Sequence, residues 1–181
     1  GVAAKYLAPA GAKTLGLLGS GWQAPPQVFA MVRAVPTLER IKVYSRTPAN
    51  REAFAHQMAT ILEMPVEAVG SAQEAIEGAD VVDLCAPGHF DVHEPLFDPP
   101  WVRPGALVVS MSANQYTADF VRGARVVAAS YENIVSEPEA KPPYNELVAS
   151  GEFRPEHVTR IGEVITKGAN PRQRDTDTVL Y

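Results

Sequence analysis

The sequence predicts an α/β fold with a doubly wound, mainly parallel six-stranded sheet. Short apolar runs typical of buried strands alternate along the chain with helical patterns. Such alternation indicates parallel strands joined by right-handed crossovers, with helices on both faces of the sheet. A glycine-rich turn directly follows the first strand and precedes a helix, which is the place where doubly wound sheets bind nucleotides. Both observations favour a Rossmann-type sheet with the strand order 3-2-1-4-5-6.

The first strand and its helix are the clearest elements. The leucine-rich run over 15–18 predicts a buried strand, and a helix is expected from Trp22 to Ala34. Pro25 and Pro26 fit the first turn of that helix, because N–H groups have no partners there. Further strands are expected over 40–44, 65–69, 80–85, 105–111 and 125–129, with helices over 48–63, from the Ser71–Glu74 capping box, and near 117–122. The residues expected to face inward are Val28, Phe29, Val32 and Val35 in the first helix, and Phe54, Met58, Ile61 and Leu62 in the second.

The loop after the first strand has the pattern Gly-x-Gly-x-x-Ala. Gly19 suits the tight turn, Gly21 has no Cβ to keep a pyrophosphate away, and Ala24 lets the helix pack closely on the sheet. The N–H groups and the positive dipole end of the helix favour phosphate. The pattern alone is weak, but its place after the first of several alternating strands predicts a dinucleotide site. The expected binding residues here are Gly19, Ser20, Gly21, Trp22, Gln23 and Ala24.

The end of the second strand selects the cofactor. NAD-binding sheets place an acidic residue there to bond the ribose 2′-hydroxyl, whereas this chain has Ser45, Arg46 and Thr47. A guanidinium pairs with a 2′-phosphate and can stack on adenine, and the hydroxyls add donors. We therefore expect NADP(H) to be preferred, with NAD(H) as the alternative. The simpler interpretation is that Arg46 is solvated and that the Ser45 and Thr47 hydroxyls merely cap the helix that follows.

The fourth strand ends at Cys85, Ala86 and Pro87, which should border the nicotinamide half of the cofactor. We interpret Cys85 as a small buried side chain rather than a nucleophile, because no partner base is evident. The loop that follows carries two histidines and two acidic residues between 89 and 94. Its prolines and glycine indicate an irregular loop, so no metal site is predicted.

The composition excludes several classes of protein. The chain has 181 residues, a net charge of −5 and 46% hydrophobic residues, which fits a globular domain and disfavours nucleic acid or an anionic membrane as partner. No apolar run reaches membrane-spanning length, and no signal peptide is evident. A single cysteine fits a reducing compartment, so we expect a cytoplasmic protein.

The two ends indicate how the chain is organised. Residues 1–12 resemble the end of a helix entering from a missing N-terminal domain, because the helical pattern begins without an N-cap. We assign 13–170 to the NAD(P)-binding domain and 171–181 to a return segment towards the missing domain. Charged residues in that segment, Arg172 to Asp177, are interpreted as a solvated linker.

Several stretches resemble the ornithine cyclodeaminase/mu-crystallin family. The most specific is Ala-Ala-Lys-Tyr-Leu-Ala over 3–8, followed by Gly-Ser-Gly-Trp-Gln-Ala over 19–24. The similarity continues through Val-Tyr-Ser-Arg-Thr-Pro over 43–48, and is weaker at Ile-Gly-Glu-Val-Ile over 161–165.

This resemblance implies a two-domain protein in which a separate domain carries dimerisation and most substrate contacts. Family members include ornithine cyclodeaminases, alanine dehydrogenases and reductases of cyclic imines and ketimines, which share hydride transfer at the α-carbon of an amino or imino acid. The expectation for this chain is therefore the nucleotide-binding domain of an NADP-dependent oxidoreductase of a small amino or imino acid, homodimeric when intact.

Two positions depart from the family pattern. Asn114 aligns with the catalytic aspartate of ornithine cyclodeaminases; an amide cannot act as a general base, although it can hydrogen-bond a substrate amine or imine. Pro25 and Pro26 replace a common Arg-Thr, so phosphate binding should depend on the first loop amides. The alternatives are a cyclodeaminase-type lyase with bound NAD, a non-catalytic NADPH-binding protein of the mu-crystallin type, and a nucleotide-free scaffold for assembly.

Overall fold

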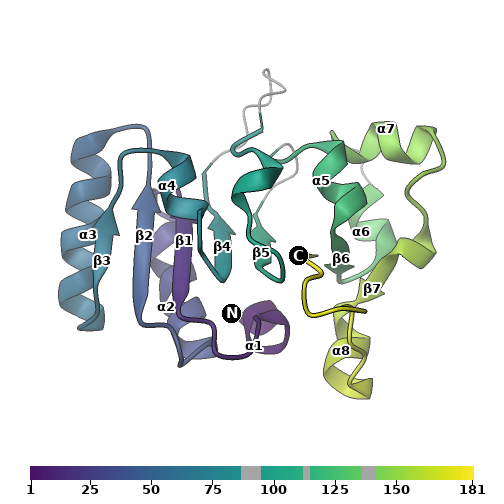
Figure 1. The fold of residues 1–181 in the computed structure, drawn as a ribbon, viewed down its shortest axis with the longest axis horizontal. Coiled ribbons are helices and arrows are strands. Elements are labelled where there is room, and N and C mark those ends of the chain that lie inside the picture. Colours follow the sequence, from purple (N-terminus) through teal and green to yellow (C-terminus); the bar gives the residue numbers. More distant parts are fainter. Residues whose placement is uncertain (87–94, 112–114, 136–141) are drawn as a thin grey trace.

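A computed structural model describes residues 1–86, 95–111, 115–135 and 142–181, and its chain alternates between strands and helices (Figure 1). The strands are β1 Thr14–Leu18, β2 Arg40–Tyr44, β3 Val66–Ala68, β4 Val81–Leu84, β5 Leu107–Ser110, β6 Arg125–Ala128, β7 Val158–Arg160 and β8 Val179–Leu180. The α-helices are α1 Val2–Leu7, α2 Ala24–Ala34, α3 Pro48–Leu62, α4 Ala72–Ile76, α5 Ala118–Gly123, α6 Tyr131–Val135, α7 Tyr144–Ala149 and α8 Ile161–Lys167. Two 3₁₀ turns, η1 Pro99–Trp101 and η2 Pro155–His157, complete the described elements.

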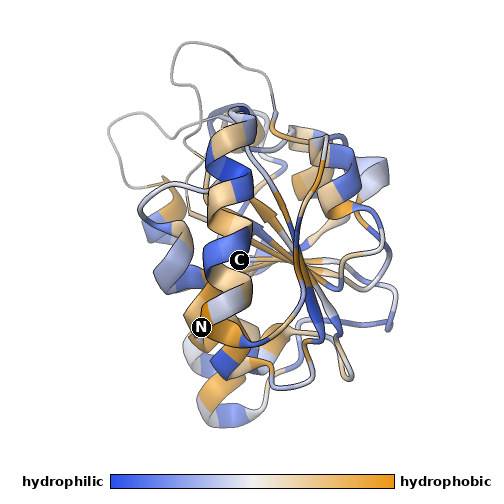
Figure 2. Ribbon diagram, turned by 90° about the vertical axis from the view of Figure 1, so that its left-hand side faces the viewer, coloured by the Kyte–Doolittle hydropathy of each residue, from blue (hydrophilic) through white to orange (hydrophobic). Residues whose placement is uncertain are grey.

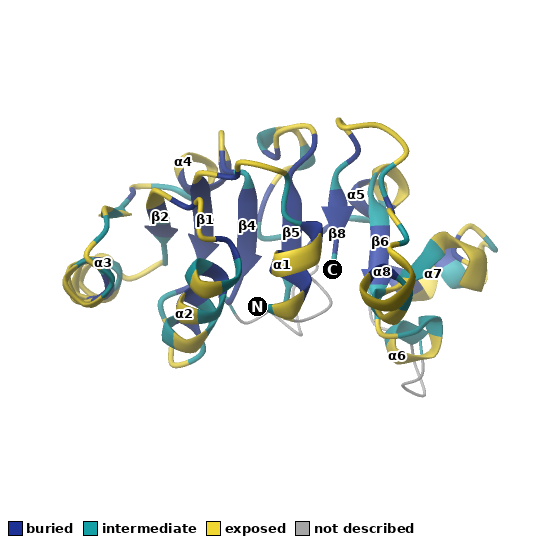
Figure 3. Ribbon diagram, turned by 90° about the horizontal axis from the view of Figure 1, so that it is seen from below, coloured by how far each residue is buried: buried dark blue, intermediate teal, exposed yellow. Residues whose placement is uncertain are grey.

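The strands form one parallel sheet with helices on both sides. Its order is β3-β2-β1-β4-β5-β8-β6-β7, and every strand pair is parallel. Seen from below, α1, α2 and α8 lie on one side of the sheet and α4 and α5 on the other (Figure 3). This confirms the predicted doubly wound α/β architecture.

The predicted count and order of strands need correction at one end. The order 3-2-1-4-5 is present, but β8 lies between β5 and β6, and β7 extends the sheet beyond β6. The structure therefore has eight described strands instead of the six expected. β8 has only two residues, and β7 has three of which only Val158 is apolar, so neither shows a strand pattern in sequence.

Two apolar clusters fill the space between the sheet and its helices. One gathers buried side chains from α1, α2, α3 and α8, and the other gathers those from α4, α5 and α7. Figure 2 shows the sheet nearly edge-on, with largely hydrophobic strands between helices that carry hydrophilic outer faces. Phe54 and Met58 of α3 are buried as expected, whereas Ile61 is 51% exposed and Phe29 of α2 is 41% exposed.

Helix starts agree with the predicted capping chemistry except at α2, at α4 and at α3, whose N-cap Thr47 makes no side-chain capping bond. α2 begins at Ala24, not Trp22, with Pro25 and Pro26 in its first turn. The Ser71 hydroxyl caps α4 by accepting from the Glu74 N–H, but the Glu74 carboxylate accepts from the Gly70 N–H and not from that of Ser71. No helix in the described ranges is both long and apolar enough to cross a membrane.

Two aspartates organise the amino-terminal edge of the sheet. Asp80 accepts hydrogen bonds from the backbone N–H groups of Lys13 and Thr14 at 2.7 and 3.0 Å, and also pairs with Arg103. Asp177 accepts from the backbone of Gln173 and Arg174 and from two arginine side chains. These bonds, led by that of the Gln173 N–H, lower the pKa of Asp177 to about 2.

The two ends of the segment 171–177 are therefore held against the domain, which the interpretation as a solvated linker did not anticipate, whereas residues 173–176 are exposed. Asp177 is buried, and Arg172 donates to the Gly105 carbonyl at 3.2 Å. Gly105 has a φ of +80°, and a Cβ there would lie 2.5 Å from the Asp175 carbonyl oxygen. The signal was hidden in sequence because the partners are separated by roughly a third of the chain, 52 residues for Arg125 and 67 for Gly105.

Replacing Gly105 by alanine tests this packing, and Gly78→Ala is the matched control. Both glycines have positive φ, but a Cβ on Gly78 would meet nothing within 4 Å. Gly78→Ala should lower the free energy of unfolding by about 1–2 kcal/mol through the left-handed backbone alone. Gly105→Ala should lower it by roughly 1–3 kcal/mol more, because the Cβ displaces a backbone carbonyl. Equal losses in urea unfolding would show that the segment does not pack tightly there.

Candidate functional site

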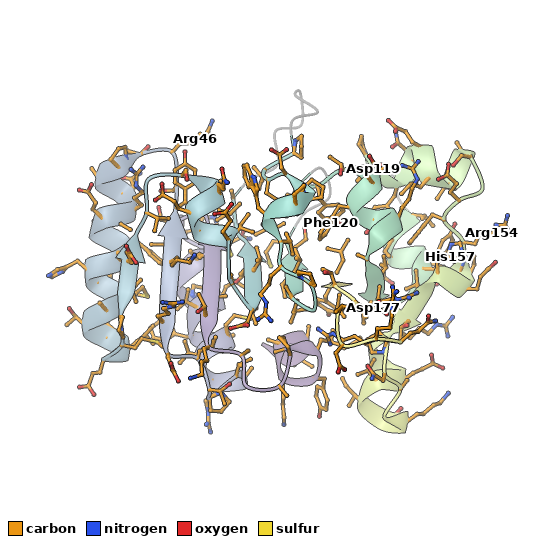
Figure 4. The ribbon with its side chains drawn as sticks, viewed as in Figure 1. Arg46, Asp119, Phe120, Arg154, His157 and Asp177 are labelled. Carbon is orange, nitrogen blue, oxygen red and sulfur yellow. The ribbon has the colours of Figure 1, made fainter. Side chains whose placement is uncertain are left out.

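A cavity of about 460 Å³ opens beside the carboxyl ends of β1, β2 and β4, a size typical of small-molecule sites. It is lined by Leu18, Gly19, Ser20, Gly21, Trp22, Gln23, Tyr44, Ser45, Arg46, Thr47, Asn50, Ala72, Cys85, Ala86 and Leu96. Figure 4 places Arg46 at this edge of the sheet and Asp177 far from it, lower in the view.

Gly19 sits where the ends of three strands converge. Its N–H donates to the Tyr44 carbonyl at 2.8 Å, which ties the end of β1 to that of β2. Its φ is +111°, and a Cβ there would lie 2.7 Å from the nitrogen of Ala86. Any other residue would therefore be strained and would push the end of β4 away, so this position requires glycine.

Gly21 faces open space, in contrast to Gly19. A Cβ added at Gly21 would meet nothing within 4 Å, so the backbone is accessible to a ligand. Within the described part of the chain, no hydrogen bond joins the N–H groups of Ser20, Gly21, Trp22 or Gln23 to another residue. These donors precede the first turn of α2, where the two prolines supply none. The residues present therefore fit a phosphate group held by loop amides.

The end of β2 forms the adjoining wall. The Ser45 and Ser20 hydroxyl oxygens are 2.8 Å apart, so one donates to the other across the loop. Arg46 is exposed, and Thr47 occupies the N-cap of α3 without a side-chain capping bond. The Thr47 hydroxyl is thus not used by the helix, and no carboxylate lies among the described residues that line this wall.

The end of β4 supplies a buried acid and a buried thiol. Asp83 is fully buried, and neither carboxylate oxygen has a hydrogen-bond partner among the described residues. Burial raises its pKa to about 6, which outweighs the lowering effect of the nearby Cys85 thiol. Burial, with Asp83 nearby, also raises the pKa of the Cys85 thiol. A thiol with a raised pKa is a poor nucleophile, in agreement with the interpretation of Cys85 as a structural residue.

The structure brings together most of the predicted residues. Ala24 is fully buried and packs α2 on the sheet instead of lining the cavity. Pro87, Asn114 and the loop histidines between 89 and 94 lie outside the described residues. Sequence reasoning missed Leu18, Tyr44, Asn50, Ala72 and Leu96, which only the tertiary fold brings to the wall. Among the described residues, no group of three or more His, Cys, Asp or Glu side chains could hold a metal ion.

A second hollow of about 600 Å³ lies among α5, β6, α7 and β7. Its two arginines are already engaged: Arg122 bonds Asp119 and Glu152, and Arg125 bonds Asp177 and Gln173. The first cavity, with its unused loop amides, is therefore the better candidate for a ligand site.

Comparison with known proteins gives a match over the whole chain. The family model for the ornithine cyclodeaminase/mu-crystallin family matches residues 1–181. Ketimine reductase mu-crystallin of Macropus fuliginosus is 26% identical over 184 residues, covering 99% of this chain and 52% of that protein. L-lysine cyclodeaminase of Streptomyces rapamycinicus is 43% identical over 81 residues, covering 45% of this chain and 23% of that protein.

A solved structure also matches nearly the whole chain. Thermococcus litoralis Delta(1)-pyrroline-2-carboxylate reductase, in complex with NADH and L-proline, superposes with a TM-score of 0.80 and 26% identity. The match covers 99% of this chain and 55% of that one. The chain spans about half the length of the curated relatives that it matches over nearly its whole length.

Asp83→Asn tests the buried acid through the pH dependence of stability. The Asp83 pKa rises from 3.8 to about 6 on folding, so the folded state binds the proton more tightly and stability falls as pH rises through this interval. The neutral asparagine avoids that loss. At about pH 7.5 the variant should be more stable by up to about 3 kcal/mol, and the difference should shrink towards pH 4.

Urea unfolding at several pH values measures this difference, with Asp98→Asn, at an exposed position, as the matched control. An Asp83→Asn variant that is less stable than the unmodified protein at every pH would contradict the assignment of an unpaired, buried carboxyl group.

Proposed function

Because the chain belongs to the ornithine cyclodeaminase/mu-crystallin family, we propose that it is the nucleotide-binding part of an NADP-dependent oxidoreductase. The reaction is hydride transfer at the α-carbon of a small amino or imino acid. The observation that carries this proposal is the cavity in which unused amides of the glycine loop adjoin the Ser45–Thr47 turn.

Each part of the cavity has its own role in this proposal. Gly19 and Ala24 shape the loop, and the N–H groups of Ser20, Gly21, Trp22 and Gln23 hold the pyrophosphate. Ser45, Arg46 and Thr47 hold the 2′-phosphate, and Cys85, Ala86 and Pro87 border the nicotinamide. The bound nicotinamide supplies the hydride, while the protein supplies orientation and electrostatics.

The preference for NADP(H) rests on charge. Ser45 and Thr47 offer hydroxyl donors, Arg46 carries a positive charge, and none of the described lining residues is acidic. A carboxylate would repel a dianionic 2′-phosphate, whereas a guanidinium attracts it and bonds it in a bidentate manner. NAD(H) remains the alternative, and the Thermococcus litoralis relative was solved with NADH.

The substrate side of the site is proposed to lie largely outside this chain. The named relatives act on ketimines, pyrroline-2-carboxylate and lysine, so a small amino or imino acid is the substrate class we propose. Asn114 would hydrogen-bond the substrate amine or imine. We expect a cytoplasmic homodimer that pairs through a further domain carrying most substrate contacts.

A cyclodeaminase-type lyase is the second candidate. The identity to L-lysine cyclodeaminase, 43% over 81 residues, favours it. Such an enzyme would use bound NAD as an oxidant that is regenerated within the cycle. Two features of the sequence argue for the reductase. No acid is present at Ser45–Thr47, and Asn114 carries an amide, which cannot act as a general base.

Arg46→Ala tests the cofactor assignment. Loss of the charged hydrogen bonds to the 2′-phosphate should weaken NADPH binding by roughly 10- to 100-fold. NADH carries a 2′-hydroxyl in place of the 2′-phosphate, so its binding affinity should fall only slightly. Fluorescence titration with each nucleotide measures both values. Equal losses for NADPH and NADH, or tighter NADH binding by the unmodified protein, would contradict the 2′-phosphate role.

The reaction class is tested by following cofactor and ammonia separately in the intact protein. A reductase should oxidise NADPH in the presence of cyclic imino acids such as pyrroline-2-carboxylate, giving one product molecule per cofactor consumed. A lyase should release ammonia from ornithine or lysine with no net change in cofactor. Ammonia release without cofactor turnover would move the assignment to the second candidate.

A further inference from the structure

Arg51 of α3 makes two contacts at the end of β2. Its guanidinium lies over the Tyr44 ring, 5.5 Å from the ring centroid, a distance typical of cation–π pairs. Its Nη1 donates to the Ser45 carbonyl at 3.0 Å. The side chain is half-buried, so both contacts are partly shielded from water.

The two residues that Arg51 contacts are those that tie β2 to the glycine loop. The Tyr44 carbonyl accepts from the Gly19 N–H at 2.8 Å, and the Ser45 hydroxyl is paired with that of Ser20 at 2.8 Å. Tyr44 and Ser45 also line the cavity, directly before Arg46. Arg51 thus contacts the cavity wall through these neighbours.

The position of Arg51 is unfavourable for the helix itself. Arg51 is the fourth residue of α3, and the first turn of α3 contains no acidic residue. A positive charge near a helix N-terminus opposes the helix dipole. Arginine at this place is therefore better explained by its contacts with Tyr44 and Ser45 than by helix stability.

We propose that Arg51 is a positioning residue for cofactor selectivity. By holding the Ser45 carbonyl and stacking on Tyr44, it fixes the Ser45–Thr47 turn so that Arg46 faces the 2′-phosphate. This inference rests on the proposed function, because it assumes that NADP(H) binds in the cavity. It adds a residue that neither the glycine pattern nor the turn sequence identifies.

Two neutral replacements separate this role from simple charge attraction. Arg51→Gln keeps a donor for the Ser45 carbonyl, and Arg51→Met covers Tyr44 with no donor; both remove the charge. If Arg51 acts by positioning, Arg51→Met should weaken NADPH binding about tenfold, and Arg51→Gln should stay within about threefold of the unmodified protein. Binding of NADH should change little in either variant. Arg33→Ala, which removes an exposed charge from the last turn of α2, is the control for bulk electrostatics.

A double-mutant cycle identifies the residue through which Arg51 acts. In an Arg46→Ala background, Arg51→Met should weaken NADPH binding much less than in the unmodified protein, because the charged group that it positions is gone and only the Ser45 and Thr47 hydroxyls remain. Urea midpoints of all variants show whether any loss comes from unfolding. Additive losses, or equal NADPH affinities for the Gln and Met variants, would overturn the positioning role. If the unmodified protein binds neither nucleotide, the proposed function fails and the inference fails with it.

Discussion

The hydrogen bond from the Gly19 N–H to the Tyr44 carbonyl joins the parts on which the site depends. It fixes the end of β1 against the end of β2 while the glycine backbone contacts the end of β4. The cavity exists because three strands end together at one residue without a side chain. The unbonded loop amides, the Ser45–Thr47 turn and the end of β4 at Cys85 all take their positions from this junction.

Acidic side chains lie at the amino edge of the sheet, whereas hydrogen-bond donors and a positive charge lie at the carboxyl edge. The amino edge is held by buried or partly buried aspartates, Asp80 and Asp177, which accept backbone N–H groups at the start of β1 and before β8. The carboxyl edge presents unused N–H donors and Arg46. Asp83 is the exception, because it lies within the sheet with no hydrogen-bond partner among the described residues. Its raised pKa follows from that burial.

Much of the fold could be predicted from sequence, for physical reasons. The strands β1 to β6 each coincide with an apolar run or with an alternation of apolar and polar residues, and helix starts such as Ser71 carry local capping chemistry. β7 and β8 could not be predicted, because so few residues show no period. The role of Asp177 depends on partners distant in sequence. In the site, the glycine loop and Ser45–Thr47 are local signals, whereas Tyr44, Asn50 and Ala72 join the wall only through tertiary packing.

The place of β8 has a consequence for how the domain assembles. The five strands from β3 to β5 are complete in sequence by Ser110, and β6 and β7 can pair with each other by Arg160. Among the strands that the structure describes, Val179 and Leu180 of β8 alone join these two sub-sheets, since β8 pairs with β5 on one side and β6 on the other. During synthesis the half from β1 to β5 can therefore fold early, whereas the second half joins the sheet only after β8 has been made.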